Sequence, residues 1–140
     1  MVWKRLMNSR TLSGHSPDFE VQYRFLEAEE GGRSTGPPYQ GFRRDWAHDG
    51  DDISRTGMFM IWPEFKDENG IPVPDGERVP AAGTAEMWIL SHEFRERVHR
   101  KRITVGIKGF LMEGSRRVAE AVVTRVIGLH LDDARTSTRQ

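Results

Sequence analysis

Hydrophobic and polar residues alternate strictly in an early segment of the chain, residues 19–26. Phe19, Val21, Tyr23 and Phe25 are each separated by one polar residue. Successive side chains of a strand point to opposite faces, so a period of two predicts a β-strand with one buried face.

Other segments predict further strands. Residues 85–90 alternate with Ala85, Met87 and Ile89 on one face and Trp88 and Leu90 on the other. The apolar run 58–62 ends at Pro63, and its length suits a strand buried on both faces, although a helix is an alternative for so short a run. Strands are also predicted over 42–46, 103–110 (with Ile103, Val105 and Ile107 inward) and 118–127.

Turn signals separate these strands and define the domain organisation. Residues 27–41 are rich in glycine and proline and predict a loop, and residues 64–80 predict a surface insertion. Several short strands between such turns are typical of a sandwich or barrel. We expect one all-β domain over 18–130, with an N-terminal extension 1–17 and a polar, disordered tail 131–140.

Two related turns flank most of the predicted strands. The first is Glu30-Gly31-Gly32-Arg33, and the second is Glu113-Gly114-Ser115-Arg116. Glycine adopts positive φ at tight turns at little cost, so Gly31, Gly32 and Gly114 are expected to do so. Arg33 and Arg116 would then hold the turns by hydrogen bonds to carbonyl oxygens. By this interpretation the turns are architecture and carry no activity.

Together with Thr35 and Gly41-Phe42-Arg43, these turns resemble the third domain of elongation factor Tu. The resemblance covers residues 19–128 and implies a roughly six-stranded antiparallel β-barrel connected with translation. In that family the third domain contacts the T-arm side of aminoacyl-tRNA, and Gly114, Ser115 and Arg116 match the turn near that contact. The chain departs from the family at Arg44-Asp45, where the family has proline and glutamine.

Composition limits the chemistry that the chain can perform. Basic and acidic residues number 21 each and cysteine is absent, which excludes disulfides and thiol nucleophiles. The nucleotide site of elongation factor Tu lies in another domain, and no P-loop lysine follows Gly31-Gly32, so we expect no GTP binding by this chain alone. The chain has no signal-like or membrane-spanning run, which predicts a soluble, cytoplasmic protein that does not bind membranes.

No residue pattern indicates an enzyme, a cofactor or a metal. The acidic loop 49–52 lacks the spacing of a calcium-binding loop and is interpreted as solvated. The histidines show no metal-ligand spacing and are expected at the surface. These are His15, His48, His92, His99 and His130.

Two functional hypotheses remain. The first is a stand-alone, non-enzymatic module that engages a protein partner, or a second copy of itself, through Trp88 and Leu90 on an outer face. The second is a tRNA- or RNA-binding module, because guanidinium groups suit phosphate geometry. Its candidate residues are Arg95, Arg97, Arg100, Lys101 and Arg102, with Gly114, Ser115 and Arg116. A solvated connection whose charges protect a sheet edge is the commoner origin of such a basic segment.

Overall fold

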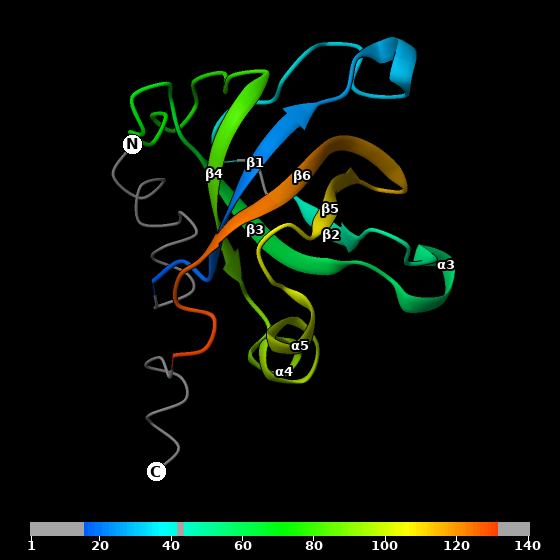
Figure 1. Ribbon diagram of the computed structural model, residues 1–140. Coiled ribbons are helices and arrows are strands. Elements are labelled where there is room, and N and C mark those ends of the chain that lie inside the picture. The colour runs from blue at the N-terminus through cyan, green and yellow to red at the C-terminus, as the bar shows by residue number, and fades with distance from the viewer. Residues whose placement is uncertain (1–15, 42–43, 132–140) are drawn as a thin grey trace.

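Six antiparallel strands form a closed barrel in the computed structural model, which describes residues 16–41 and 44–131 (Figure 1). The order around the barrel is β1-β4-β3-β2-β5-β6, and β6 pairs with β1 to close it. Closure pairs both edges of the sheet, and the predicted all-β barrel is confirmed. The strands are β1 (Phe19–Phe25), β2 (Asp45–His48), β3 (Phe59–Phe65), β4 (Ala82–Ile89), β5 (Lys108–Glu113) and β6 (Arg116–Val126).

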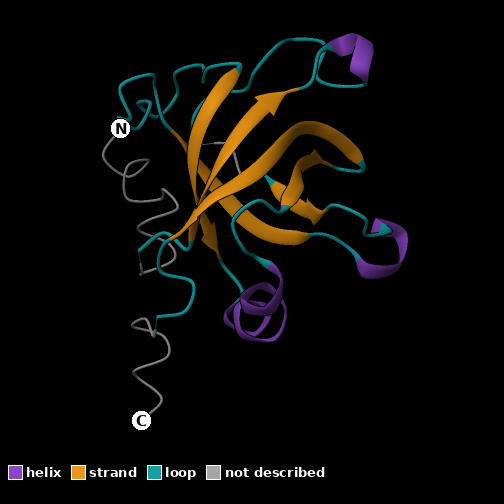
Figure 2. Cartoon of the chain, viewed as in Figure 1, coloured by secondary structure: helices purple, strands orange, loops and turns teal. Residues whose placement is uncertain are grey.

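Short helices lie outside the barrel wall (Figure 2). The longest helical stretch joins β4 to β5 and consists of three consecutive pieces, with a π-helical piece in the middle. The Ser91 hydroxyl caps its start by accepting a hydrogen bond from the Phe94 N–H. The helical elements are η1 (Ala28–Glu30), α3 (Ile53–Thr56), α4 (His92–Phe94), η2 (Arg95–His99) and α5 (Arg100–Arg102).

The alternating segments build the core as predicted. Phe19, Val21 and Tyr23 of β1 are almost completely buried, and so are Ala85, Met87 and Ile89 of β4. The two strands pair directly, with Phe19 opposite Met87 and Val21 opposite Ala85. Their inward faces therefore pack on each other and on the inner face of β6.

The prediction for the apolar run 58–62 is partly wrong. β3 continues through Pro63 to Phe65, and only alternate residues face inward. Met60, for example, is 54% exposed. The Leu90 N–H donates to Met60 O and the Lys66 N–H donates to Thr84 O, so the backbone groups that face β4 are those of even-numbered residues. The nitrogen of Pro63 faces away from β4, where no ladder bond is lost.

The prediction for 103–110 is also partly wrong. Helix α5 ends at Arg102, and strand β5 begins only at Lys108. Ile103 is buried, but Val105 is 67% exposed. Gly106, between the helix and β5, takes a positive φ of 94°, so the segment turns before the strand starts. The strand predicted over 42–46 is found as β2, shifted toward His48, and residues 42–43 lie outside the described residues.

Different segments close the two ends of the barrel. At the loop end, the segment 66–81 between β3 and β4 inserts Val73 and Val79 into the core. The predicted insertion is thus not purely surface. At the helix end, the helix 92–102 covers the core together with residues 16–18 and 127–131. The predicted extension and tail fall mostly in 1–15 and 132–140, outside the described residues.

Candidate functional site

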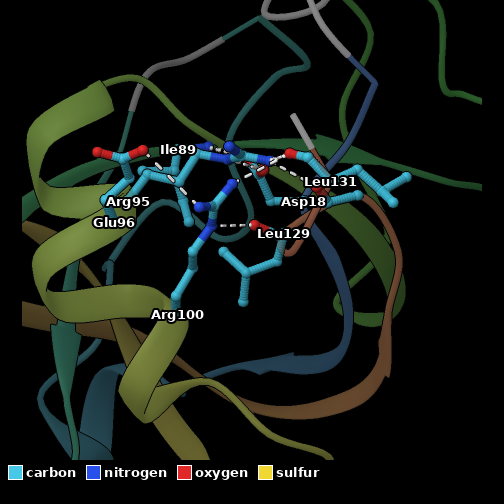
Figure 3. A network of polar contacts seen from close by, with 8 residues as sticks. Asp18, Ile89, Arg95, Glu96, Arg100, Leu129 and Leu131 are labelled. Carbon is cyan, nitrogen blue, oxygen red and sulfur yellow. Dashed lines mark hydrogen bonds and ion pairs between the residues drawn. The ribbon is translucent and has the colours of Figure 1, made fainter. Parts of the chain in front are cut away.

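The basic segment predicted to bind RNA forms the helix 92–102, and its first arginine is buried. Arg95 is 1% exposed, and its Nε donates a hydrogen bond of 2.7 Å to Oδ1 of the fully buried Asp18. Its Nη2 donates to the carbonyl oxygens of Gly128 and Leu131. Arg95 therefore joins the helix to both the start of β1 and the segment after β6 (Figure 3).

Arg100 extends this network one turn further along the helix (Figure 3). Its Nε donates to Leu129 O at 2.7 Å, and its Nη2 donates to Leu131 O at 3.1 Å. Asp18 uses its second oxygen to accept from the Ile89 N–H at 2.8 Å. Every bond in this network is internal, so we interpret Asp18, Arg95 and Arg100 as a fastening of the helix to the barrel.

Arg102 is a third internal contact of the same segment. Both of its Nη groups donate to the carboxylate of Asp51 at 3.0 Å, in a bidentate pair. The hydrogen bond from Arg102 lowers the pKa of Asp51. The acidic loop 49–52 is therefore not merely solvated.

Two cations of the segment remain at the surface. Lys101 is exposed, and the Arg97 side chain is 76% exposed with Glu93 3.7 Å away. Gly114, Ser115 and Arg116 are also exposed, but they lie at the far end of β5 from the helix. The six residues of β5 span roughly 17 Å, so the two parts of the predicted RNA site do not come together.

The two related turns contact each other through side chains. Arg33 and Arg44 both form ion pairs with Glu113, and the Arg33 Nε donates to Gly36 O at 2.8 Å. The expected carbonyl contact of Arg33 is confirmed. Burial lowers the pKa of Arg44, and the nearby Glu113 opposes that shift.

The glycines of these turns have two different roles. Gly31 and Gly114 take positive φ values of 91° and 58°, as predicted. Gly32 does not, and that prediction is wrong. A Cβ on Gly32 would lie 2.2 Å from Leu26 O, so the residue is small because the backbone of Leu26 passes against it.

The outer face of β4 does not offer Trp88 to a partner. Trp88 is fully buried, opposite Trp62 in the β3–β4 register, so its predicted role as an exposed contact is wrong. Leu90 is half-buried. The alternation pattern placed Trp88 on the outer face, but it could not show that the neighbouring strand brings Trp62 directly opposite it.

Exposed apolar residues lie on the strand beside Leu90 and in the helix that follows it. Met60 and Phe94 are 54% and 41% exposed. The Leu90 N–H bonds Met60 O, and the Phe94 ring packs edge-on against Phe59 with 5.3 Å between ring centroids. We call Met60, Leu90 and Phe94 the helix-side strip.

Two histidines that the sequence analysis placed at the surface are buried in contact with each other. His48 is 2% exposed and His99 is fully buried, and His48 Nε2 lies 3.2 Å from His99 Nδ1. The Trp46 Nε1–H donates to His48 Nδ1 at 3.3 Å, and the Phe59 ring packs against both imidazoles.

The π-helical piece η2 positions one of these rings. Its buried residues are Arg95 and His99, which lie four positions apart and face the barrel together. A wider helical turn of this kind is frequent at functional sites. The spacing of Arg95 and His99 indicates that both lie on one face of a helix. It does not indicate the contact with His48, which lies 51 residues away from His99 in the chain.

Burial shifts the titration of both rings in the same direction. Loss of hydration lowers the pKa of His48 to about 4 and that of His99 to about 3. The positive charge of Arg102 lowers both further. Both imidazoles are therefore neutral at pH 7.

The described residues contain no group of three or more His, Cys, Asp or Glu side chains that could hold a metal ion. Among the helices of the same residues, none is both long and apolar enough to cross a membrane. The chain matches no protein-family model, and a search of curated proteins gives no significant match.

Proposed function

We propose that this chain is a non-enzymatic binding module that engages a protein partner through the helix-side strip. The observation that carries the proposal is the exposure of two apolar side chains near the half-buried Leu90: Met60, which lies opposite Leu90 on the neighbouring strand, and Phe94, which lies in the helix that follows Leu90. Burying such side chains against a partner removes apolar surface from water, at roughly 25 cal/mol per Å². Exposed apolar patches on folded proteins commonly mark such contacts.

The surroundings of the strip also suit a protein interface. Glu93 and Arg97 lie on either side of Phe94 along the helix, and their side chains are 64% and 76% exposed. A protein interface has an apolar centre within a polar, hydrated rim. The strip with these two charges has that composition on a small scale.

The link to translation rests on the sequence alone. The turns Glu30–Arg33 and Glu113–Arg116 resemble those of the third domain of elongation factor Tu, and a closed six-stranded barrel is compatible with that domain. Folds persist while activities change, so the resemblance supports a choice of partners to test and not an activity. Components of the translation machinery are therefore the first partners to test, and a second copy of the chain is the simplest.

Photocrosslinking tests the proposal directly. A photoreactive residue is placed at Met60 and, as a matched control, at Val105, which is also exposed and apolar but belongs to the segment before β5. We expect a defined crosslinked protein from position 60 only, and Phe94→Glu should weaken it. Sedimentation velocity on the purified chain identifies the partner as a second copy if Phe94→Glu shifts a dimer to monomer. Equal crosslinking from both positions, or none from position 60 with a monomeric chain, would reject the strip as an interface.

RNA binding is the alternative, and the exposure of Arg97 and Lys101 is the observation that favours it. Phosphate contacts make affinity fall steeply with salt, whereas an apolar interface is far less sensitive. A tRNA titration at two salt concentrations therefore separates the two functions.

A further inference from the structure

Trp46, His48 and His99 form a chain of hydrogen bonds with one direction, and this chain is possible only while both imidazole rings are neutral. The indole N–H of Trp46 can only donate, so His48 Nδ1 must accept and the His48 proton resides on Nε2. That Nε2–H points at His99 Nδ1, which therefore also accepts. The His99 proton then resides on its own Nε2. This assignment follows from the donor and acceptor roles of the three side chains.

Adding a proton to either ring reverses one of these contacts. A second proton on His48 goes to Nδ1, where it meets the Trp46 N–H. A second proton on His99 goes to Nδ1, where it meets the His48 Nε2–H. In each case a hydrogen bond between donor and acceptor becomes a contact between two donors, in a place from which water is excluded.

The charges around the pair oppose protonation as well. Arg102 of α5 is the cation beside both rings, and Asp51, in the loop after β2, is the anion beside His48. Asp51 is already bound by both Nη groups of Arg102, which neutralises much of its charge. From the neighbouring strands, β3 presents the Phe59 ring to the pair and β2 presents Trp46, and neither side chain carries a charge. A proton on either ring is thus a buried charge without a counter-ion of its own.

The pair also connects two elements of the fold. His48 belongs to β2 and His99 to the helix 92–102. The other polar fastenings of the helix contact residues outside β2, namely Asp18, Asp51 and the segment 128–131. The histidine contact is therefore a direct polar link between the second half of the helix and β2 of the barrel wall.

We propose that His48 and His99 form a proton-sensitive latch, which holds the helix 92–102 against the barrel when both rings are neutral and releases it when they become charged. Opening lets both rings reach water and take up protons at their ordinary pKa of about 6.5. In the closed form they resist protonation until the pH is much lower. Acid therefore favours the open form, which exposes Phe59 and the apolar residues beneath the helix. The inference does not depend on the proposed protein-binding function.

Amide hydrogen exchange, corrected for intrinsic rates, measures the opening. The Ile103 N–H donates to His99 O and reports on the end of the helix, whereas the Phe25 N–H donates to Ala81 O at the opposite end of the barrel. We expect the protection factor of Ile103 to fall between pH 7 and pH 5, with a slope approaching about 100-fold per pH unit because two protons are taken up. At pH 5 it should be well below that of Phe25. Equal protection of the two amides at pH 5 would mean that the helix opens only with the whole barrel, and would overturn the proposal.

The double variant His48→Gln/His99→Gln supplies the second test. A glutamine amide can accept from Trp46 and donate onward, but it does not titrate, so the pH slope of Ile103 protection should disappear. The control His92→Gln removes a half-buried histidine whose partner is Glu96 on the same helix, and it should keep the slope. A slope that survives in the double variant would contradict the latch.

The wild-type protein tests the latch even where the double variant does not fold. The ¹⁵N chemical shifts of the imidazole nitrogens identify the protonated atom of each ring at pH 7. The proposal requires both rings to be neutral with the proton on Nε2. A charged ring at pH 7, or a proton on Nδ1 of either histidine, would overturn it.

Discussion

At the loop end of the barrel, two valines and a glutamine amide close the core, whereas at the helix end two histidines, an arginine and an aspartate share that role. Gln40 donates to Phe65 O and Val73 O and accepts from the Phe65 N–H, so one neutral side chain satisfies three backbone groups. At the other end, Arg95 and Asp18 form a buried ion pair, and His48 contacts His99. The first closure depends on packing and neutral hydrogen bonds, and the second depends on charge state.

This difference predicts that the helix end is the more fragile of the two. A neutral buried group that loses its partner costs one unsatisfied hydrogen bond, whereas a buried charge that loses its partner costs far more. Substitutions at the two ends should therefore differ in size and in their dependence on pH.

The largest effect is expected from Arg95→Ala. This change leaves the fully buried carboxylate of Asp18 without its counter-ion, which should lower the free energy of unfolding by about 3–5 kcal/mol. Urea denaturation followed by tryptophan fluorescence measures it. Arg97→Ala on the same helix is the control and should change stability by less than about 0.5 kcal/mol, because that side chain is 76% exposed. A loss below about 1 kcal/mol for Arg95→Ala would show that the ion pair does not fasten the helix.

Two glycine substitutions compare the packing of the two ends. A Cβ on Gly109 would lie 2.0 Å from the Trp46 ring at the helix end, whereas a Cβ on Gly83 would meet Tyr23 near the loop end at an ordinary 3.5 Å. Gly109→Ala should destabilise the protein by about 3 kcal/mol through overpacking. Gly83→Ala should be neutral or stabilise it by up to about 1 kcal/mol, because alanine reduces the entropy of the unfolded chain. Thermal unfolding of both variants decides, and equal effects would contradict the close approach of Gly109 to Trp46.

The helix end was also the part that the sequence predicted least well. Strands β1, β4 and β6 follow from alternation because their inward positions are apolar and their outward positions are mostly polar. In the helix 92–102 the inward positions include the polar residues Arg95 and His99. The apolar residues alone therefore do not repeat with the 3.6-residue period of a helix. Phe94 and Val98, four residues apart after the capping Ser91, were the available signal for a helix.

The candidate site was hidden for a related reason. The predicted interface residue Trp88 is buried, and the predicted RNA ligands Arg95, Arg100 and Arg102 are engaged in contacts within the protein. Sequence identifies residue types that are able to bind a ligand, but the hydrogen-bond partners of these three arginines lie 29 to 77 residues away. Only tertiary structure decides whether a guanidinium group meets an internal carboxylate or remains available at the surface.

A smaller effect is expected from Gln40→Leu at the loop end. The substitution removes three hydrogen bonds with the backbone of Phe65 and Val73, and it should cost about 2 kcal/mol. Because an amide does not titrate, the loss should be the same at pH 7 and pH 5. Urea denaturation at both pH values measures it. A loss that grew at pH 5 would mean that the loop end also responds to charge, and would remove the contrast between the two ends.

The smallest effect on stability is expected from Arg97→Glu/Lys101→Glu, the exposed cations that make no strong internal contact. Stability should change by less than about 0.5 kcal/mol, because Arg97 has only a distant pair with Glu93 and Lys101 is exposed. The variant is therefore a clean probe of RNA binding. With only two such cations on the helix, neutralising two phosphates gives a logarithmic salt slope of about −1.8 for a duplex, which describes weak, non-specific contact. Titration of bulk tRNA at low and moderate salt, followed by tryptophan fluorescence, measures this slope. A saturable complex with a slope near −4 that the variant abolishes would require further phosphate contacts, and would establish RNA in place of protein as the ligand of the helix end.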